Sequence, residues 1–368
     1  MPGGSERIAS THKQDREYAD MFKAWSTSKG NKYGYYHATT DAENEYSDTE
    51  GFKGMYPAAD EREVLIRTTK LIADTMIIFT VISLGTRTLF SGRPHDIMGM
   101  HLVREGFFIG NGQPSVYLTY IYNILLRIIP ILYLTIRTGS NIEIMVPLKI
   151  TNKPLFKHSA FFAAIAFGVL YLSLDVEHSI FGTHRQWEDL LLIESQGKRI
   201  SILILYGTII PIMSEVIQRG IFLSLFRQYG DGFGMIISSL LAASVNCEGS
   251  FMFCFAYSLM LSYFVLSTGS VLTSLLMRLI ISNSFFGITM FRLFYSETFP
   301  MLTITIIIMF IGIGLIATIR FISRYSSRIS MPIYNMYLTD TDKVMTMLSS
   351  PAIIVWITVY GIGNLMLP

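Results

Sequence analysis

The chain has 368 residues, of which 51% are hydrophobic and only 15% are charged. Several apolar runs reach the roughly 20 residues that a helix needs to cross a bilayer, so the sequence predicts an all-α, polytopic transmembrane helical bundle. The formal net charge of +2 excludes a strongly basic, nucleic-acid-binding protein. Cys247 and Cys254 are the only cysteines, too few for a disulfide framework or a thiolate metal site.

The first 70 residues differ from the rest of the chain. They hold 10 of the 29 basic and 12 of the 27 acidic residues in under a fifth of the length. Tyrosines lie there among Gly, Asn, Asp and Ser, so the segment can bury too little apolar surface to offset its ordering entropy. We therefore expect residues 1–70 to form a polar, largely disordered cytoplasmic segment or one docked at the periphery of the membrane part.

Nine apolar runs follow, and we interpret each as one spanning helix. They lie at 71–90, 116–136, 156–174, 200–226, 233–250, 251–267, 270–290, 301–322 and 350–367. The polar break at 246–250 and the last run, which starts at Pro351, leave eight and ten spans as alternatives. The membrane part divides into N-terminal helices and loops (71–199), an intramembrane core (200–290) and C-terminal helices (301–368).

The short loops predict the orientation. The loop between the second and third spans carries four basic residues against one acid, and the loop between the eighth and ninth carries four against two. By the positive-inside rule both loops are cytoplasmic. With nine spans, we expect a multi-pass protein of the cell membrane with its N-terminus in the cytoplasm and its C-terminus outside. The loop 175–199, with five acidic residues, then lies outside as well.

Ionisable side chains inside the apolar runs mark the candidate site, because a charge within the bilayer is costly unless it is paired or hydrated. Glu215 and Arg219 lie four apart in the fourth span, so on a helix they share one face and can pair. At 1.5 Å per residue, Glu215, Asn246 and Arg278 lie ~16, ~18 and ~12 Å from the cytoplasmic ends of their helices. Polar residues from three helices are therefore expected at similar depth.

The order and spacing of these residues resemble the intramembrane core of the CPBP family, also described as Abi-like, which includes CAAX-prenyl proteases and bacteriocin-processing or immunity proteins. The family pattern Glu-Glu-x-x-x-Arg-Gly resembles Ser214-Glu215-x-x-x-Arg219-Gly220. The family's Phe-x-x-x-His, Thr-Gly-Ser and His-x-x-x-Asn resemble, in order, Ala242-x-x-x-Asn246, Thr268-Gly269-Ser270 and Arg278-x-x-x-Ser282. This resemblance is the basis for the site hypothesis.

The resemblance implies an intramembrane endopeptidase in which the first Glu and two His activate a water, with or without zinc. Those positions are Ser214, Asn246 and Arg278 in this chain. None of these side chains accepts a proton near neutral pH, and one carboxylate, Glu215, does not make a zinc site. We therefore expect no metal cofactor and impaired catalysis, with Ser214, Glu215, Arg219, Asn246, Arg278 and Ser282 as the residues at the family's motif positions.

Arg278 has two interpretations. In the first, it joins Glu215 and Arg219 in a buried cluster where relatives hold their water, since an Arg–carboxylate pair can satisfy itself in a low dielectric. In the second, Glu215 and Arg219 clamp the bundle while Arg278 extends to the cytoplasmic surface. Arg127, in the second span, likewise either faces a cavity or partner or reaches the interface. An acidic and histidine-containing set in the outer loop has no recognised metal-ligand spacing and is expected to be solvated: Glu177, His178, His184 and Glu188.

Three classes of function stay open. The favoured one is a catalytically impaired relative, a pseudoprotease, that binds a peptide, prenyl-like or lipid-like ligand in an intramembrane cavity as a chaperone, immunity or assembly factor. The second is an active CPBP endopeptidase for bacteriocin processing or self-immunity. The third is an unrelated polytopic protein such as a transporter component, although paired broken helices are not evident in the sequence. The lipid bilayer is the one partner that the sequence predicts; it indicates no nucleic acid and identifies no protein partner.

Overall fold

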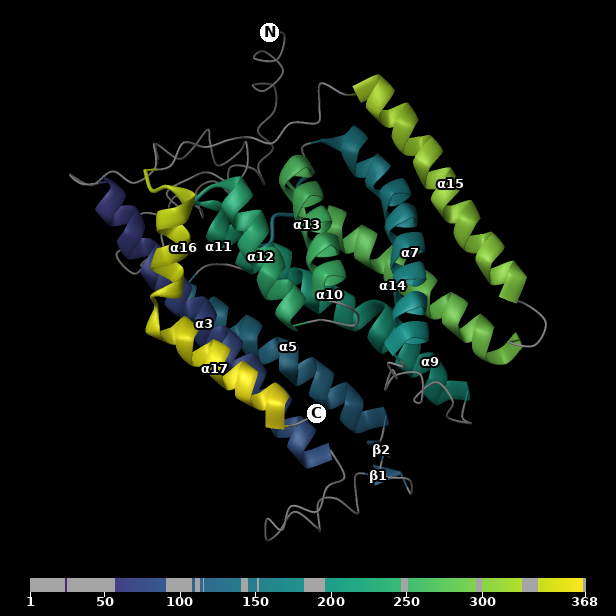
Figure 1. The fold of residues 1–368 in the computed structure, drawn as a ribbon, viewed down its shortest axis with the longest axis horizontal. Coiled ribbons are helices and arrows are strands. Elements are labelled where there is room, and N and C mark those ends of the chain that lie inside the picture. Colours follow the sequence, from purple (N-terminus) through teal and green to yellow (C-terminus); the bar gives the residue numbers. More distant parts are fainter. Residues whose placement is uncertain are drawn as a thin grey trace.

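The computed structural model describes residue 24 and residues 57–90, 108–109, 113–114, 116–139, 145–150, 152–181, 196–245, 251–295, 300–325 and 337–366. This part of the chain is a bundle of helices (Figure 1). Two two-residue strands, β1 (Phe108–Ile109) and β2 (Gln113–Pro114), form a short antiparallel pair beyond the helices. The predicted fold class, a helical membrane bundle, is confirmed.

Each of the nine predicted runs coincides with helical structure. The helices are α3 (Pro57–Phe90), α5 (Val116–Thr138), α7 (Lys153–Phe181), α9 (Gln196–Ile204), α10 (Ile210–Glu215), α11 (Leu223–Arg227), α12 (Asp231–Val245), α13 (Phe251–Thr268), α14 (Val271–Tyr295), α15 (Pro300–Tyr325), α16 (Asp340–Leu348) and α17 (Pro351–Met366). Two π-helical segments, η1 (Leu205–Ile209) and η2 (Val216–Phe222), join α9, α10 and α11 into one continuous helix.

The number of spans is lower than predicted within the described residues. Five helices there are long and apolar enough to cross a membrane, and a sixth results if α16 and α17, bent by 65°, count as one broken span. Helices α12 and α13 are apolar but contribute stretches shorter than a bilayer needs, 231–245 and 254–268. The protein is therefore a multi-pass membrane protein, and the count of nine is not confirmed.

Helix α3 begins earlier than the sequence predicted. It starts at Pro57, a residue favoured in the first turn of a helix, so residues 57–70 are not part of a disordered segment. Glu61 and Leu65 are fully buried there. The expectation of disorder up to residue 70 is wrong for this stretch, because Leu65 packs in a hydrophobic cluster with residues of later helices. The first 56 residues lie outside the described part, apart from residue 24.

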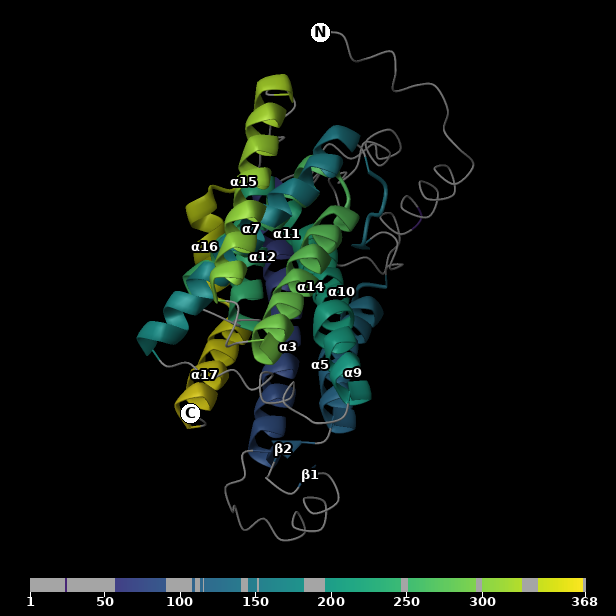
Figure 2. The same ribbon diagram turned by 90° about the vertical axis from the view of Figure 1, so that its right-hand side faces the viewer.

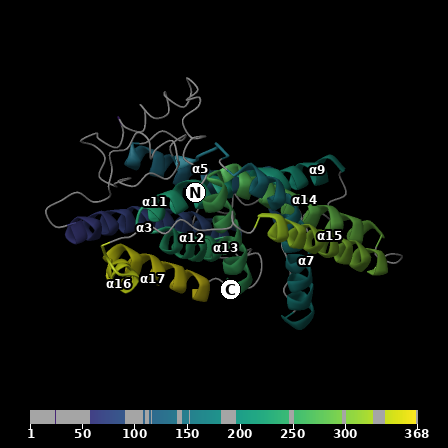
Figure 3. The same cartoon turned by 90° about the horizontal axis from the view of Figure 1, so that it is seen from above.

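Two hydrophobic clusters form the core, and the α9–α11 helix connects them. One cluster joins α3 with η2, α11 and α12, for example through Ile72, Phe222 and Leu241. The other joins α9 with α7, α13, α14 and α15, for example through Ile202 and Met277. Helices α17 and α15 pack at opposite ends of the bundle, α17 along α3 and α15 against α7 (Figures 1 and 3). Figure 2 shows the same helices from the side. The helix that carries the candidate motif is therefore central to both halves of the bundle.

Candidate functional site

Glu215 and Arg219 form the ion pair that their spacing predicted. The Nη1 of Arg219 lies 3.3 Å from Oε1 of Glu215, and the side chains are 2% and 1% exposed. Arg219 also donates to Oε1 of Gln218 and to the backbone carbonyl of Ser258 on α13. The second carboxylate oxygen, Oε2 of Glu215, is buried and has no hydrogen-bond partner among the described residues. The pair is thus held away from water, with one acceptor atom unsatisfied.

The helix around this pair departs from α-helical geometry on both sides. Glu215 ends α10, and the next residues belong to η2, so Arg219 lies inside a π-helical segment. Farther back, Asn283 of α14 donates to the carbonyl of Gly207 in η1 at 3.0 Å. A Cβ at Gly207 would lie 2.8 Å from Oδ1 of Asn283, so the absence of a side chain there permits this contact. Short π-helical insertions are frequent at functional sites, and the sequence analysis did not predict them.

Ser214 lies next to a buried cation. Its Oγ accepts a hydrogen bond from Nε of Arg127 at 3.0 Å, and both side chains are buried. The Nη1 of Arg127 also donates to the backbone carbonyl and Oδ1 of Asn123, one turn earlier on α5. Of the two interpretations of Arg127, the one in which it faces the interior holds. Ser214, which stands where the CPBP pattern has its first Glu, is therefore hydrogen-bonded to a guanidinium.

Arg278 lies near the buried ion pair, because its charge acts on that of Arg219. Direct pairing of Arg278 with Glu215, the other contact of the expected three-residue cluster, stays a prediction. The guanidinium of half-buried Arg278 lies 5.2 Å from the ring centroid of Tyr257 on α13, which is cation–π geometry. Tyr257 interacts electrostatically with Glu215 and Arg219 as well. An aromatic side chain that the sequence analysis did not single out thus connects the cation to the ion pair.

The other predicted site residues are less informative. Asn246 lies outside the described residues, just beyond the end of α12 at Val245. Ser282 lies on α14, one turn after Arg278. Of the outer-loop set, 184 and 188 also lie outside the described residues, and 177 and 178 lie on the last turns of α7, where side chains are not described. Among the residues that the structure describes, no group of three or more His, Cys, Asp or Glu could hold a metal ion.

His158 is the one histidine whose side chain the structure describes, and it is not part of this site. Its ring stacks on Phe321 of α15 with a centroid distance of 4.2 Å, and its Nε2 lies 3.3 Å from the hydroxyl of Thr318. These contacts fix α15 against α7. The imidazole therefore serves helix packing in this structure.

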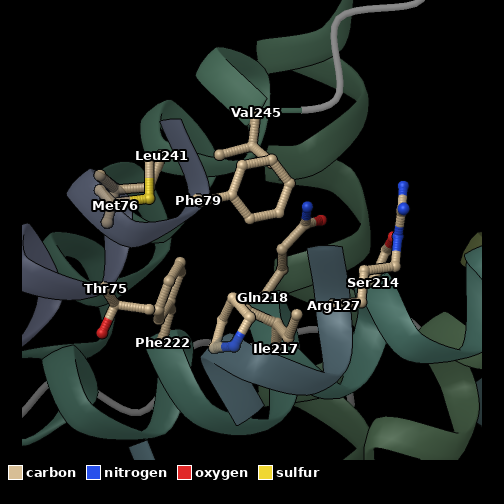
Figure 4. Close-up of a pocket in the computed structure, with 11 residues that line it drawn as sticks. Thr75, Met76, Phe79, Arg127, Ser214, Ile217, Gln218, Phe222, Leu241 and Val245 are labelled. Carbon is tan, nitrogen blue, oxygen red and sulfur yellow. The ribbon is translucent and has the colours of Figure 1, made fainter. Parts of the chain in front are cut away.

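A small cavity adjoins Ser214 on the side facing α3, α5 and α12 (Figure 4). Its volume is about 10 Å³, roughly the room that one water molecule needs. The lining is mostly apolar, with four polar residues, and comprises Thr75, Met76, Phe79, Arg127, Pro130, Ser214, Ile217, Gln218, Phe222, Leu241 and Val245. The sequence analysis missed Gln218, although it lies four residues after Ser214, the spacing that already indicated a shared face for Glu215 and Arg219.

Residues 196–282 match a protein family described as Rce1-like, type II CAAX prenyl endopeptidase. The match covers α9 to the middle of α14 and includes the motif positions from Ser214 to Ser282, so the resemblance to the CPBP family predicted from the sequence is confirmed. No curated protein and no solved structure matches the chain.

Proposed function

We propose that the protein is a catalytically impaired, membrane-embedded relative of Rce1-like endopeptidases, which uses the retained scaffold to bind a peptide-like or lipid-like ligand. The observation that carries this proposal is the hydrogen bond from Arg127 to Ser214. Where the resemblance implies a carboxylate that activates water, this chain has a neutral hydroxyl beside a permanent positive charge. Proton abstraction at that position is disfavoured, because neither group accepts a proton near neutral pH.

The remaining motif positions support the same conclusion. Arg278 stands where the family has a histidine, and its guanidinium is a donor only. Asn246, at the other histidine position, is an amide that cannot act as a base. A zinc ion does not fit this donor set either, since Ser214, Asn246 and Arg278 provide none of the imidazole, thiolate or carboxylate ligands that zinc prefers. Glu215 is the one carboxylate at these positions, and its first oxygen is used by Arg219.

The cavity beside Ser214 is the proposed ligand site. Met76, Phe79 and Leu241 supply apolar walls from two helices, and Arg127, Ser214 and Gln218 supply polar groups. Such a lining fits a ligand with an apolar body and a polar end better than a fully polar molecule. The cavity has room for about one water, so a chain-like ligand requires the lining side chains to move apart.

A photoreactive amino acid at position 79 tests whether a ligand occupies this site. Phe79 lines the cavity, whereas Val81, two residues along α3, is 55% exposed on the outer surface. Benzophenone-alanine at 79 should capture one peptide-like or lipid-like species in cell membranes, identified by mass spectrometry. The same group at 81 should capture the bulk lipids in proportion to their abundance. An identical product profile at both positions would contradict ligand binding in the cavity.

We also propose that the N-terminus is cytoplasmic and the C-terminus external, on the strength of the two basic loops. Reporter fusions after Lys153 and Arg328 should give cytoplasmic signals, and fusions after Glu194 and Pro368 should give external ones. The fusion at Pro368 is the most informative, because α16 and α17 are bent by 65° and can form either one broken span or a re-entrant pair. A cytoplasmic signal at Pro368 would show that the last span does not cross the membrane and would contradict an odd number of spans.

One observation favours an active endopeptidase as the second candidate function. Nothing in the described part of the chain donates a hydrogen bond to the buried Oε2 of Glu215, so this oxygen can accept one from a water or substrate group. This carboxylate would then have to act without the histidines that the family uses. The third class, an unrelated transporter component, is disfavoured because residues 196–282 match the Rce1-like family.

A further inference from the structure

The first turns of α7 and the last turns of α15 pack against each other at one end of the bundle (Figure 1). His158 of α7 stacks on Phe321 of α15 with the ring centroids 4.2 Å apart. Deeper in the pair, a Cβ on Gly314 of α15 would lie 2.9 Å from the carbonyl oxygen of Phe161 of α7. Residue numbers therefore rise along α7 as they fall along α15, so the two helices are antiparallel.

Four basic side chains flank the aromatic stack: Lys153, Lys157, Arg320 and Arg324. Lys157 directly precedes His158 in the sequence. Arg320 likewise directly precedes Phe321. Two antiparallel helices are related by a local two-fold axis perpendicular to their common plane, so the residues that precede two facing residues lie on the same side of the pair. Lys153 and Arg324, each about one turn nearer its helix end, lie on that side as well because a helix has 3.6 residues per turn.

These four residues form a basic patch without a carboxylate partner in the described part of the chain. All four are exposed, and no ion pair among the described residues includes them. The guanidinium of Arg324 lies 5.8 Å from the ring centroid of Tyr325, a neutral partner. Neither 144–174 nor 298–339 contains an acidic residue, so the two helices supply no counter-charge of their own. The basic patch therefore concentrates positive charge on one side of the helix pair.

The basic patch lies at a boundary of the membrane part. Lys153 begins one candidate span, and Arg324 is the residue before the end of another. Phe161 and Ile316, one turn deeper than Lys157 and Arg320, are 45% and 58% exposed, as expected of side chains that contact lipid acyl chains. A phospholipid whose chains lie against these apolar side chains has its headgroup at the level of the basic patch.

We propose that the basic patch binds the phosphate headgroup of an anionic phospholipid. Lys and Arg form strong, charge-assisted hydrogen bonds to phosphate oxygens, and basic surfaces between transmembrane helices bind anionic headgroups. Among the described helices α15 packs mainly against α7, so a lipid bound to both helices holds α15 in the bundle. This surface is separate from the cavity beside Ser214, and its ligand is independent of the proposed function.

Native mass spectrometry of the purified full-length protein in uncharged detergent tests the proposal. Dioleoyl-phosphatidylglycerol and dioleoyl-phosphatidylcholine have the same acyl chains and differ in the net charge of the headgroup. Each Lys or Arg near an anionic headgroup contributes roughly fivefold in affinity. We therefore expect the first phosphatidylglycerol to bind about tenfold or more tightly than phosphatidylcholine. Equal affinities for the two lipids would overturn the proposal.

Two double variants localise the binding. Lys157→Gln/Arg320→Gln removes the two cations beside the aromatic stack, and Lys153→Gln/Arg324→Gln removes the two nearer the helix ends. Each should weaken phosphatidylglycerol binding by about tenfold or more and leave phosphatidylcholine binding unchanged. All four side chains are exposed, so the two variants provide independent tests that do not disturb the core. A phosphatidylglycerol preference that survives in both variants would overturn the assignment to this patch.

Arg62→Gln/Lys70→Gln is the matched control. It removes two exposed cations of α3, which begins at the same end of the bundle (Figure 1). Acidic residues lie on the same helix, for example Glu63 and Asp74. The control should leave the preference for phosphatidylglycerol unchanged. A loss as large as in the other two variants would show attraction to the total charge of the protein and would overturn a localised site.

An acidic stretch of the same chain is the alternative occupant of the basic patch. Residues 41–50 include five acidic side chains. In the variant that replaces them all, the preference for phosphatidylglycerol should equal that of the wild-type protein; its substitutions are Asp41→Asn, Glu43→Gln, Glu45→Gln, Asp48→Asn and Glu50→Gln. A preference that is present in this variant and missing in the wild-type protein would show that the chain covers its own patch, and would overturn the lipid as its occupant.

Discussion

Glu215→Gln should lower the free energy of unfolding by about 3–5 kcal/mol, because it leaves the Arg219 guanidinium buried without a counter-charge. Arg219 is only 2% exposed, so water cannot replace the lost partner. The second variant, Glu215→Gln with Arg219→Met, should recover much of the loss by removing the unpaired charge. Thermal and denaturant unfolding in detergent, arranged as a double-mutant cycle, measures this coupling.

The chain offers a matched control for this cycle. Glu63 and Arg67 of α3 have the same spacing and form an ion pair, but their side chains are 62% and 46% exposed. Glu63→Gln should therefore cost less than about 1 kcal/mol. Equal losses for the two pairs, or strictly additive effects of the Glu215 and Arg219 substitutions, would show that the buried pair does not stabilise the core.

Glu61→Ala should lower the free energy of unfolding by roughly 2–4 kcal/mol, because it removes the acceptor of two backbone N–H groups. The Oε2 of Glu61 accepts from Tyr337 at 3.0 Å and from Leu338 at 2.9 Å, and the side chain is fully buried. These bonds join the start of α3 to the residues that precede α16, 276 positions away in the sequence. Hydrogen exchange at Tyr337 and Leu338 should increase more than exchange in α13. Glu63→Gln, at a 62% exposed side chain two positions along α3, should have little effect on either measurement.

The same residue predicts a pH dependence. Burial raises the pKa of Glu61 above its ordinary value of 4.5, although the Leu338 N–H and the Lys343 charge act in the opposite direction. The folded state therefore holds this proton more tightly than the unfolded state. The resulting stability is fully present below about pH 4.5 and is lost as the pH rises through the folded pKa. The unfolding midpoint of Glu61→Ala should lack this decline, and an unchanged slope would contradict the assignment to Glu61.

The sequence predicted the features that depend on local spacing. The apolar runs predicted the helices. The four-residue separation of Glu215 and Arg219 predicted their ion pair, since both residues lie on one helix. The boundary at Pro57 was missed because many of the residues after it are polar in sequence and are buried only by contacts with later segments, as Glu61 shows.

Contacts between distant helices could not be predicted in the same way. Arg127 and Ser214 are 87 positions apart, and nothing in either helix indicates that they meet. The Glu215–Arg278 pair was inferred from similar depth and opposite charge, but neither determines which face of a helix a side chain occupies, so the pair stays a prediction. The cation–π contact of Arg278 with Tyr257 of the neighbouring helix was not predicted. The π-helical segments also have no clear sequence pattern, and the Asn283 contact with Gly207 requires the packed arrangement of two helices.

Cleavage of a farnesylated CAAX-type peptide, followed by mass spectrometry, tests the proposed loss of catalysis most directly. The wild-type protein is compared in liposomes with Glu215→Gln and with Glu215→Gln/Arg219→Met, a variant expected to stay folded without the carboxylate. We predict that none of the three proteins forms product. Cleavage by all three would contradict the proposed loss of catalysis and would show that the activity does not depend on Glu215. Cleavage by the wild-type protein that disappears in the folded double variant would show that Glu215 still activates water and would contradict the pseudoprotease proposal.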